Sequence, residues 1–562
     1  MTNVAGQTAL PQSEDVSGFC RTPDHVMQLS RMGSAHPTRL SFLRILLRRM
    51  HNEGWQFDRP LWDLDAKGVG RAVYRAKGPE RTYSLVAFAH DLPDHMRSDR
   101  VIATAWDATF ALCDGEPTAA DLDRLAANVP LQEAGRVSTS ELCLSRANRS
   151  VRLFLHVVDR LAAGQQPDLT DLQSVGYLMR TTAVYGAGKF GSLDRDRMSD
   201  RAEMAEPFQA EMLSVWLIRA FTVDLVNHLA AAKGGDTAVT LDKGLRRHLG
   251  VGNATGLGMA PFLVRHPVLL NNWMAVREEA LARVRALPQA SADSVALFRK
   301  ALAAAHRNAA TWASEHPLQI TKLADLRRDL AHIDDRTANW TDAGQPWNKL
   351  WLWASDTLSE EGQEALIALM LEPHGALVDG LACCLSAEEG TSFALDGAMT
   401  IDTLCGVLEQ HYAWALSIDF ALPESQSQFW YVSEEKLEPR IGTRFDEAGA
   451  EREQPLCIAR MACELHAAIK DLPRQDSVAA FLLAAPAHRQ MVRRAQIAAR
   501  HPYAEVHGNL IAKDILPIDL LRFKLAFFGA SHFDPRSDKW VRISLFQGHP
   551  FPDEINSTSG SG

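Results

Sequence analysis

Three glycines surrounded by hydrogen-bond donors form the segment of this sequence whose spacing most clearly suggests chemistry. Gly186, Gly188 and Gly191 satisfy G-x-G-x-x-G, the spacing found where backbone N–H groups meet the pyrophosphate of a dinucleotide. Such a loop must open an amphipathic helix, so that the helix dipole faces the phosphates. Residues 192–201 instead alternate in charge and offer almost nothing to pack. The pattern therefore favours a simpler anion site over a nucleotide fingerprint.

Donor side chains crowd around this loop. Arg180 and Thr182 precede it, and Tyr185 and Lys189 lie within it. Cationic side chains recognise carboxylate and phosphate groups through charge-assisted hydrogen bonds. We therefore expect Arg180 and Thr182 to bind an anionic substrate, and Tyr185 and Lys189 to be catalytic. An ordinary surface hairpin is the alternative.

A second glycine cluster spans residues 250–258 and includes Asn253 and Thr255. Glycines ahead of a helix N-terminus can present several N–H groups to an anion. On that basis we predict Asn253 and Thr255 as substrate ligands. The competing interpretation is a tight connection between two helices, with glycines at positive φ.

Basic residues recur at helical spacing between residues 146 and 160. Ser138 and Glu141 have the spacing of a capping box, which predicts a helix that ends at Gly164. One side of that helix would carry the row: Arg146, Arg149, Arg152, His156 and Arg160. Such a row forms a solvated face or, on an internal helix, the wall of an anion-binding cavity. We select Arg149 from it as a substrate-binding residue.

Residues 431–442 are dense in acidic and basic side chains. Glu435 and Glu438 could supply a general base, with Arg440 as its orienting partner or as a substrate ligand. An exposed loop with local ion pairs is the alternative. We expect one pocket to be lined by residues from the two glycine clusters and the basic row: Arg149, Arg180, Tyr185, Lys189, Asn253 and Thr255.

Metal and nucleophile motifs are absent from the sequence. It contains no H-E-x-x-H, no paired C-x-x-C and no EF-hand loop, which are the common metal-binding patterns. It also lacks the G-x-S-x-G of serine hydrolases. We therefore predict no metal ligand, and the cofactor stays unknown.

The secondary-structure elements expected along the chain indicate an α+β protein. It is predominantly α-helical, with a small N-terminal antiparallel β-sheet. Alternating apolar residues predict strands at 70–76, 82–89 and 101–112, and a helix at 39–49 lies beside them. Pro207 suits the first turn of a buried helix that reaches about residue 228. The predicted organisation is a disordered tail (1–35), a small α/β domain with a three-stranded sheet (36–130), a helical domain with both glycine-rich loops (131–345), a mostly helical C-terminal domain (346–555) and a flexible tail (556–562).

Bulk composition excludes several classes of protein. The net charge of −10 argues against a nucleic-acid partner, because such proteins carry a basic excess. No run of 18 apolar residues and no secretory signal are visible, so we predict no membrane segment. The eight cysteines have no C-x-x-C spacing, which fits reduced thiols in the cytoplasm.

These observations predict a soluble cytoplasmic enzyme that acts by acid–base chemistry on a small carboxylate- or phosphate-bearing metabolite, with homo-oligomer formation left open. The first alternative is a nicotinamide- or flavin-dependent oxidoreductase that uses the loop at 186–191. The second is a non-catalytic helical interaction or regulatory protein.

Overall fold

The structure is a computed structural model. It describes residues 16–96, 105–131, 138–182, 191–192, 198, 200–253, 266–314, 317–338, 340, 344–385, 394–422, 458–507, 517–530, 532–534 and 542–556.

One mixed β-sheet joins the N-terminal part of the chain to its C-terminal strands. In the described chain its strands are β1 (Gln56–Leu64), β2 (Gly70–Lys77), β3 (Thr82–Ala89), β4 (Ala108–Asp114), β5 (Glu141–Arg149), β6 (Tyr177–Thr181), β7 (Gly191–Ser192), β8 (Gly250–Asn253), β9 (His532–Asp534) and β10 (Arg542–Leu545). Their order is β1-β2-β3-β4-β5-β6-β8-β10-β9, with β7 paired to β5. Neighbours are antiparallel, except β6 and β8, which run parallel.

The predicted class is therefore confirmed in its coarse form, since the protein is α+β and mostly helical. The prediction of a small antiparallel sheet is wrong, because the sheet is large and mixed. β8 and β10 have four residues each. Strands this short carry too little alternation to be recognised in a sequence.

Helices form the rest of the described chain. The longer ones are α3 (Phe42–Asn52), α4 (Ala119–Asn128), α5 (Phe154–Ala162), α7 (Gln209–Gly234), α10 (Pro267–Ala286), α11 (Ala292–Thr311), α12 (Pro317–Thr337), α13 (Pro346–Thr357), α14 (Glu360–Leu371), α16 (Ile401–His411), α18 (Ile458–Ile469), α20 (Arg489–Arg500) and α21 (Pro517–Phe528). The shorter ones are α1 (Pro23–Val26), α2 (Leu29–Met32), α6 (Leu169–Val175), α8 (Lys243–Arg246), α15 (Gly375–Val378), α17 (Ala413–Leu416), α19 (Val478–Ala484) and the 3-10 helix η8 (Asp379–Cys384).

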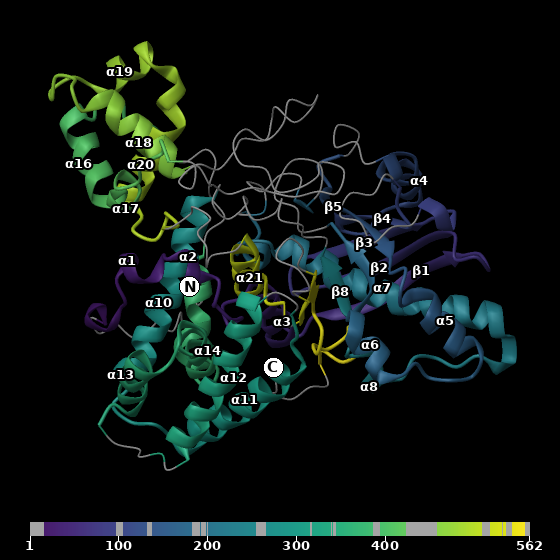
Figure 1. Cartoon of the computed structure of the whole chain (residues 1–562). Helices are drawn as coiled ribbons and strands as arrows, with labels where there is room; N and C mark the ends of the chain where they lie inside the picture. The colour runs from purple at the N-terminus through teal and green to yellow at the C-terminus, as the bar shows by residue number, and fades with distance from the viewer. Residues whose placement is uncertain are drawn as a thin grey trace, which may run out of the picture.

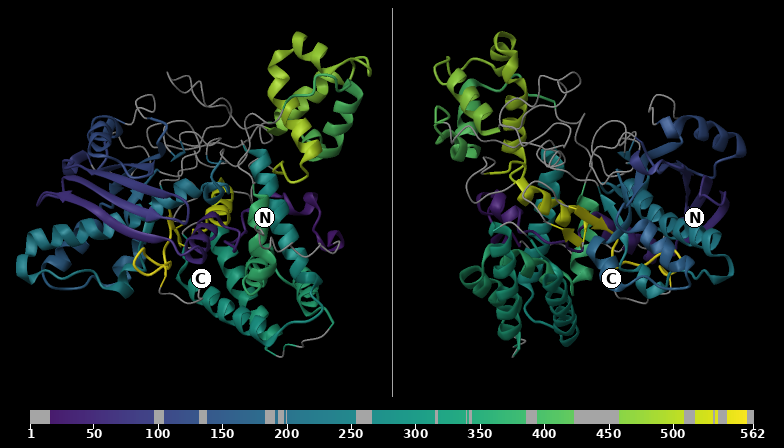
Figure 2. Two further views of the ribbon diagram at one scale, coloured as in Figure 1. Left: turned by 180° about the vertical axis from the view of Figure 1, so that it is seen from behind. Right: turned by 45° about the vertical axis from the view of Figure 1, so that its right-hand side comes forward.

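The helices occupy three regions around the sheet (Figure 1). α5 and α7 lie against the sheet, and α10 to α14 form a helical body beside it. α16 to α20 project from that body as a separate group, which is also seen from behind in Figure 2. α7 is the buried central helix that the sequence predicts, because its side chains are buried on nearly every face. On the opposite face of the sheet, Val86 and Leu144 pack with Leu125 of α4.

The predicted helix over residues 138–164 is wrong: the chain forms strand β5 and then α5. One of the two capping-box contacts does exist, since the backbone N–H of Ser138 donates to the Glu141 carboxylate. β5 lies in the middle of the sheet with both faces buried, so Leu142, Cys143 and Leu144 are all inaccessible. A strand buried on both sides shows no alternation and can be mistaken for a helix.

The sequence predicts a disordered tail over residues 1–35, whereas residues 16–35 of it contain short helices and several buried side chains. Val26, Leu29 and Met32 are each about 1% exposed. Arg21 and Arg31 are also buried, and both form ion pairs with Glu364 of α14. The charges of these two arginines are thus used in buried ion pairs rather than solvated.

Candidate functional site

The structure places three of the sequence-predicted site residues on neighbouring strands. Arg180 on β6 pairs in register with Gly252 on β8, and Asn253 is the last residue of β8. Thr182 follows β6, is buried, and donates its backbone N–H to the carbonyl of Arg146 over 3.0 Å. Arg180, Thr182 and Asn253 therefore lie at the same end of two parallel strands, but Asn253 is paired with Thr181 and so faces the other side of the sheet from Arg180.

Arg149 points away from Arg180. Asn148 is opposite Arg180, and Arg149 is opposite Met179. Opposed residues share a face of a sheet and successive residues alternate, so Arg149 and Arg180 face opposite sides. The Arg149 guanidinium lies 4.8 Å from the ring of Phe154. The other predicted site residues lie outside the described part of the chain: Tyr185, Lys189, Thr255, Glu435, Glu438 and Arg440.

The row of basic residues does not form one surface. Arg146 and Arg149 are on β5, whereas His156 and Arg160 are on α5. His156 lies 3.1 Å from a carboxylate oxygen of Asp171, and Arg160 donates to the carbonyl of Gln166. The row is split because the expected helix is a strand followed by a helix.

Both glycine clusters contribute strands. Gly191, the last glycine of G-x-G-x-x-G, begins β7 rather than a helix, so the strand–loop–helix arrangement of a dinucleotide site is not formed there. Gly250 and Gly252 lie in β8. A Cβ at Gly250 would lie 2.2 Å from the carbonyl oxygen of Leu545 on β10. These two glycines allow close contact between strands and need no ligand to explain them.

A cavity of about 780 Å³ lies between α3, α11, α12, α14, the end of α21 and the turn that follows β10. This volume falls within the usual range for small-molecule sites. The basic residues in its wall are Arg39, Arg44, Arg48, Arg247 and Lys300, and the acidic residue in its described wall is Glu372. The cavity is therefore a cationic site, although the sequence analysis did not identify it.

α3 positions the cationic side of the cavity. Its Phe42, Leu46 and Met50 are fully buried in the core. Arg44 and Arg48, four residues apart, point to the cavity side. The start of α3 is held in place because the Ser41 hydroxyl donates to the carbonyl of Ala526 over 2.6 Å.

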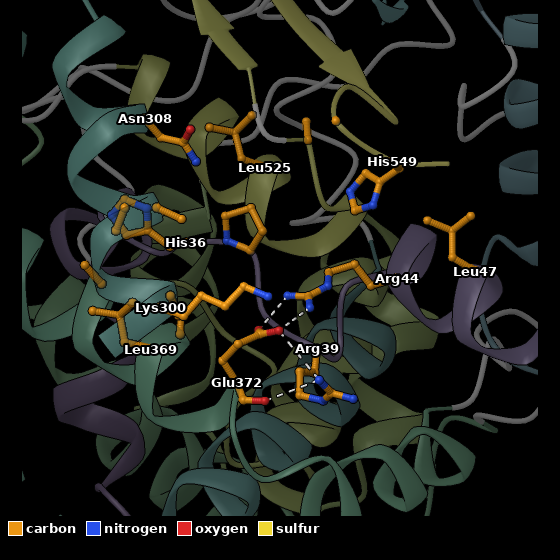
Figure 3. A pocket seen from close by; sticks show the side chains of 18 of the residues that line it. His36, Arg39, Arg44, Leu47, Lys300, Asn308, Leu369, Glu372, Leu525 and His549 are labelled. Carbon is orange, nitrogen blue, oxygen red and sulfur yellow. Dashed lines mark hydrogen bonds and ion pairs between the residues drawn. The ribbon is translucent and has the colours of Figure 1, made fainter. Parts of the chain in front are cut away.

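Two carboxylates neutralise part of this charge. Arg44 donates to both oxygens of Glu372, over 2.8 and 2.6 Å. Arg39 donates to both oxygens of Asp379, over 2.8 and 2.6 Å, and Arg48 lies 3.2 Å from the same carboxylate. Three arginines thus share two carboxylates, which leaves a formal excess of positive charge. Figure 3 shows Arg39 and Arg44 around Glu372, with the Lys300 side chain pointing toward this group.

Two polar atoms in the cavity wall are buried without a hydrogen-bond partner in the described chain: Nη1 of Arg48 and Nε2 of His36. Burial lowers the pKa of Arg48 to about 10, although the Asp379 carboxylate opposes this change. A buried polar group without a partner is costly. These atoms are therefore candidate contacts for a ligand.

Two histidines of the wall, His36 and His549, are neutral groups. Burial lowers the pKa of His36 to about 4, and its ring stacks on Trp312 with 5.8 Å between centroids. Burial, assisted by Arg44 and Arg219, lowers the pKa of His549 to about 3. At neutral pH both imidazoles can donate or accept hydrogen bonds. They add no charge to the site.

The rest of the described wall is apolar. α11 contributes Leu297, Ala301, Ala304 and Ala305. α14 contributes Ala365, Ala368 and Leu369, α21 contributes Leu525, and Leu47 of α3 lies on the side away from α11 (Figure 3). The site therefore combines a cationic region with an apolar one.

Sequence reasoning did not find this cavity. Its only local signal is the spacing of Arg44 and Arg48 on an amphipathic helix, which is also typical of a solvated helix face. Asp379 and Glu372, their partners, are more than 300 positions away.

Comparisons with known proteins found no matching protein family, no similar curated protein and no similar solved structure. Within the described residues, no group of three or more His, Cys, Asp or Glu side chains could hold a metal ion. In the same residues, Gln209–Thr237 is long and apolar enough to cross a membrane, but 61% of its most apolar part is buried inside the protein. A core helix has the same properties.

Proposed function

We propose that this protein is an enzyme that binds a small anionic metabolite in the cavity beside α3 and acts on it by acid–base chemistry. One observation carries the proposal: the buried Nη1 of Arg48 has no hydrogen-bond partner among the described residues and belongs to a group with more arginines than carboxylates. A carboxylate or phosphate would satisfy this donor and balance the charge.

His36 is the candidate acid–base group. Its Nε2 is buried in the wall without a described partner, and its ring is neutral at physiological pH because burial lowers its pKa to about 4. A neutral imidazole can accept a hydrogen bond or a proton from a bound ligand.

Arg180 and Thr182 at the end of β6, with the backbone of Asn253 at the end of the parallel β8, are a second proposed anion site. The observation in its favour is the pairing of β6 with β8, which brings residues of both glycine-flanking segments to adjacent strands. The strand at Gly191 does not favour the oxidoreductase alternative.

The first site can be tested by thermal melting in phosphate, sulfate and succinate. A ligand at 100 times its dissociation constant stabilises the folded state by about 2.7 kcal/mol. We expect Arg48→Met to weaken anion binding roughly 10- to 100-fold, the value of a charge-assisted hydrogen bond. Its ligand-free melting point should change little, because Asp379 keeps both hydrogen bonds from Arg39.

Arg307→Met is the matched control, because Arg307 is exposed on α11 and does not line the cavity. Equal anion responses from wild type, Arg48→Met and Arg307→Met would contradict the proposal. The same titrations with Arg180→Met test the second site.

A further inference from the structure

We infer that the ligand of this cavity is an amphipathic anion, with its acidic head group at Arg48 and Lys300 and an elongated apolar body along α11 and α14. This inference rests on the proposed function, because it specifies the ligand of the same site.

The charged region of the cavity can hold one head group. Glu372 and Asp379 leave one of their three arginines without a carboxylate of its own. Lys300 is exposed and points toward Arg44 and Glu372 (Figure 3). A single carboxylate or phosphate between Arg48 and Lys300 would balance this excess, because a cation that is partly withdrawn from water needs an anionic partner.

The apolar wall is a continuous stripe on one helix. Leu297, Ala301, Ala304 and Ala305 recur at spacings of four, three and one, so they share one face of α11. From Lys300, where the head group is placed, to Asn308 at the far end, the wall covers about 12 Å at the rise of an α-helix. Such a length suits an extended chain rather than a compact metabolite.

Small side chains create the space beside this stripe. Alanines line the wall on α11, and Ala365 and Ala368 line it on the facing α14. Leu297 also lines the cavity and is 48% exposed. An apolar side chain that stays exposed at a cavity marks a surface which a ligand would cover.

This argument predicts how affinity depends on chain length. Each methylene that enters an apolar site tightens binding about fourfold. Butyrate, octanoate and the uncharged octanol separate the two parts of the site. We expect octanoate to bind about 200-fold more tightly than butyrate, since it has four more methylenes, and more tightly than octanol by at least about tenfold.

Two variants assign these effects to the two regions, with dissociation constants measured by isothermal titration calorimetry. Arg48→Met should lower the affinity for octanoate to nearly that for octanol, and it should leave the affinity for octanol unchanged. Ala304→Trp should fill the apolar region, and octanoate should lose most of its advantage over butyrate. Ala303→Trp is the matched control, because Ala303 is the exposed neighbour on α11 and does not line the cavity.

The outcomes distinguish this inference from the proposed function. If phosphate and butyrate bind but octanoate binds no more tightly, the inference is overturned and the anion site stands. If octanol binds as well as octanoate and Arg48→Met has no effect, the cavity takes apolar ligands and the head-group assignment is overturned. If none of these ligands binds, both proposals fail.

Discussion

At the residue scale, Lys524 on α21 is a buried amine without a counter-ion in the described chain. Its side chain is 2% exposed, and its Nζ has no hydrogen-bond partner there. The ring of Phe528 lies 5.2 Å away. Burial lowers the pKa of Lys524 to about 7, whereas an unfolded chain keeps it near about 10.4. Between these values the unfolded state binds a proton that the folded state lacks, so stability rises with pH. Below pH 7 both states carry the proton, and the contribution is constant.

We therefore expect Lys524→Met to be more stable than wild type at pH 7.5, by on the order of 4 kcal/mol. The difference should shrink toward pH 9.5, by up to about 1.4 kcal/mol per pH unit. Urea unfolding at pH 7.5, 8.5 and 9.5 measures it, with exposed Lys67→Met as control. If the free energies of unfolding of wild type and Lys524→Met change in parallel with pH, the Lys524 amine is not held in its uncharged form in the folded protein.

At the scale of elements, glycines serve opposite purposes in β8 and α16. Alanine at Gly250 would bring its Cβ within 2.2 Å of a backbone oxygen of β10, whereas Gly406 in α16 has no atom within 4 Å of a Cβ position. We expect Gly250→Ala to destabilise the protein by about 3 kcal/mol, because backbone cannot move aside cheaply. Gly406→Ala should stabilise it by about 0.5–1 kcal/mol, because the helix loses less entropy. Thermal melts of both variants test this pair of predictions. If Gly250→Ala melts like wild type but loses anion binding, Gly250 is needed for ligand binding rather than for strand packing.

At the scale of the whole molecule, the N-terminal segment is joined to the helical body by a buried ion network. Arg21 donates to both oxygens of Glu278 on α10, over 2.8 and 2.6 Å, and to Glu364 on α14 over 2.7 Å. Arg277 also donates to Glu364, and the three arginines around it hold the pKa of Glu364 well below its usual range against the effect of burial. The contacts of Arg21 connect residues more than 250 positions apart.

Removal of one member of this ion network should therefore destabilise the folded protein. We expect Arg21→Met to destabilise the protein by about 3–5 kcal/mol, because Glu278 would remain buried without its main partner. Arg21→Met combined with Glu278→Met should cost less than the sum of the two single changes. Urea midpoints of the three variants measure this coupling. A cost below about 1 kcal/mol for Arg21→Met would mean that residues 16–35 detach easily.

The sequence by itself determined the elements whose pattern is local. The alternation in β2 and β3, the apolar run of α7 and the periodicity of α3 follow from side chains within one or two turns or one strand pair. These patterns sufficed for the α+β, mostly helical class. They could not reveal β5, because a strand covered on both faces loses its alternation.

Only the tertiary structure decided where the candidate site lies. From its helical spacing alone, Arg48 is expected on a solvated helix face. In the structure, η8 supplies its partner Asp379, and α11 and α14 line the cavity beside it. Likewise, Arg21 lies in a polar segment that is buried only because acidic groups from distant helices meet it. The physical reason is that charge and burial at these positions depend on partners hundreds of residues away, whereas sequence periodicity reports only on near neighbours.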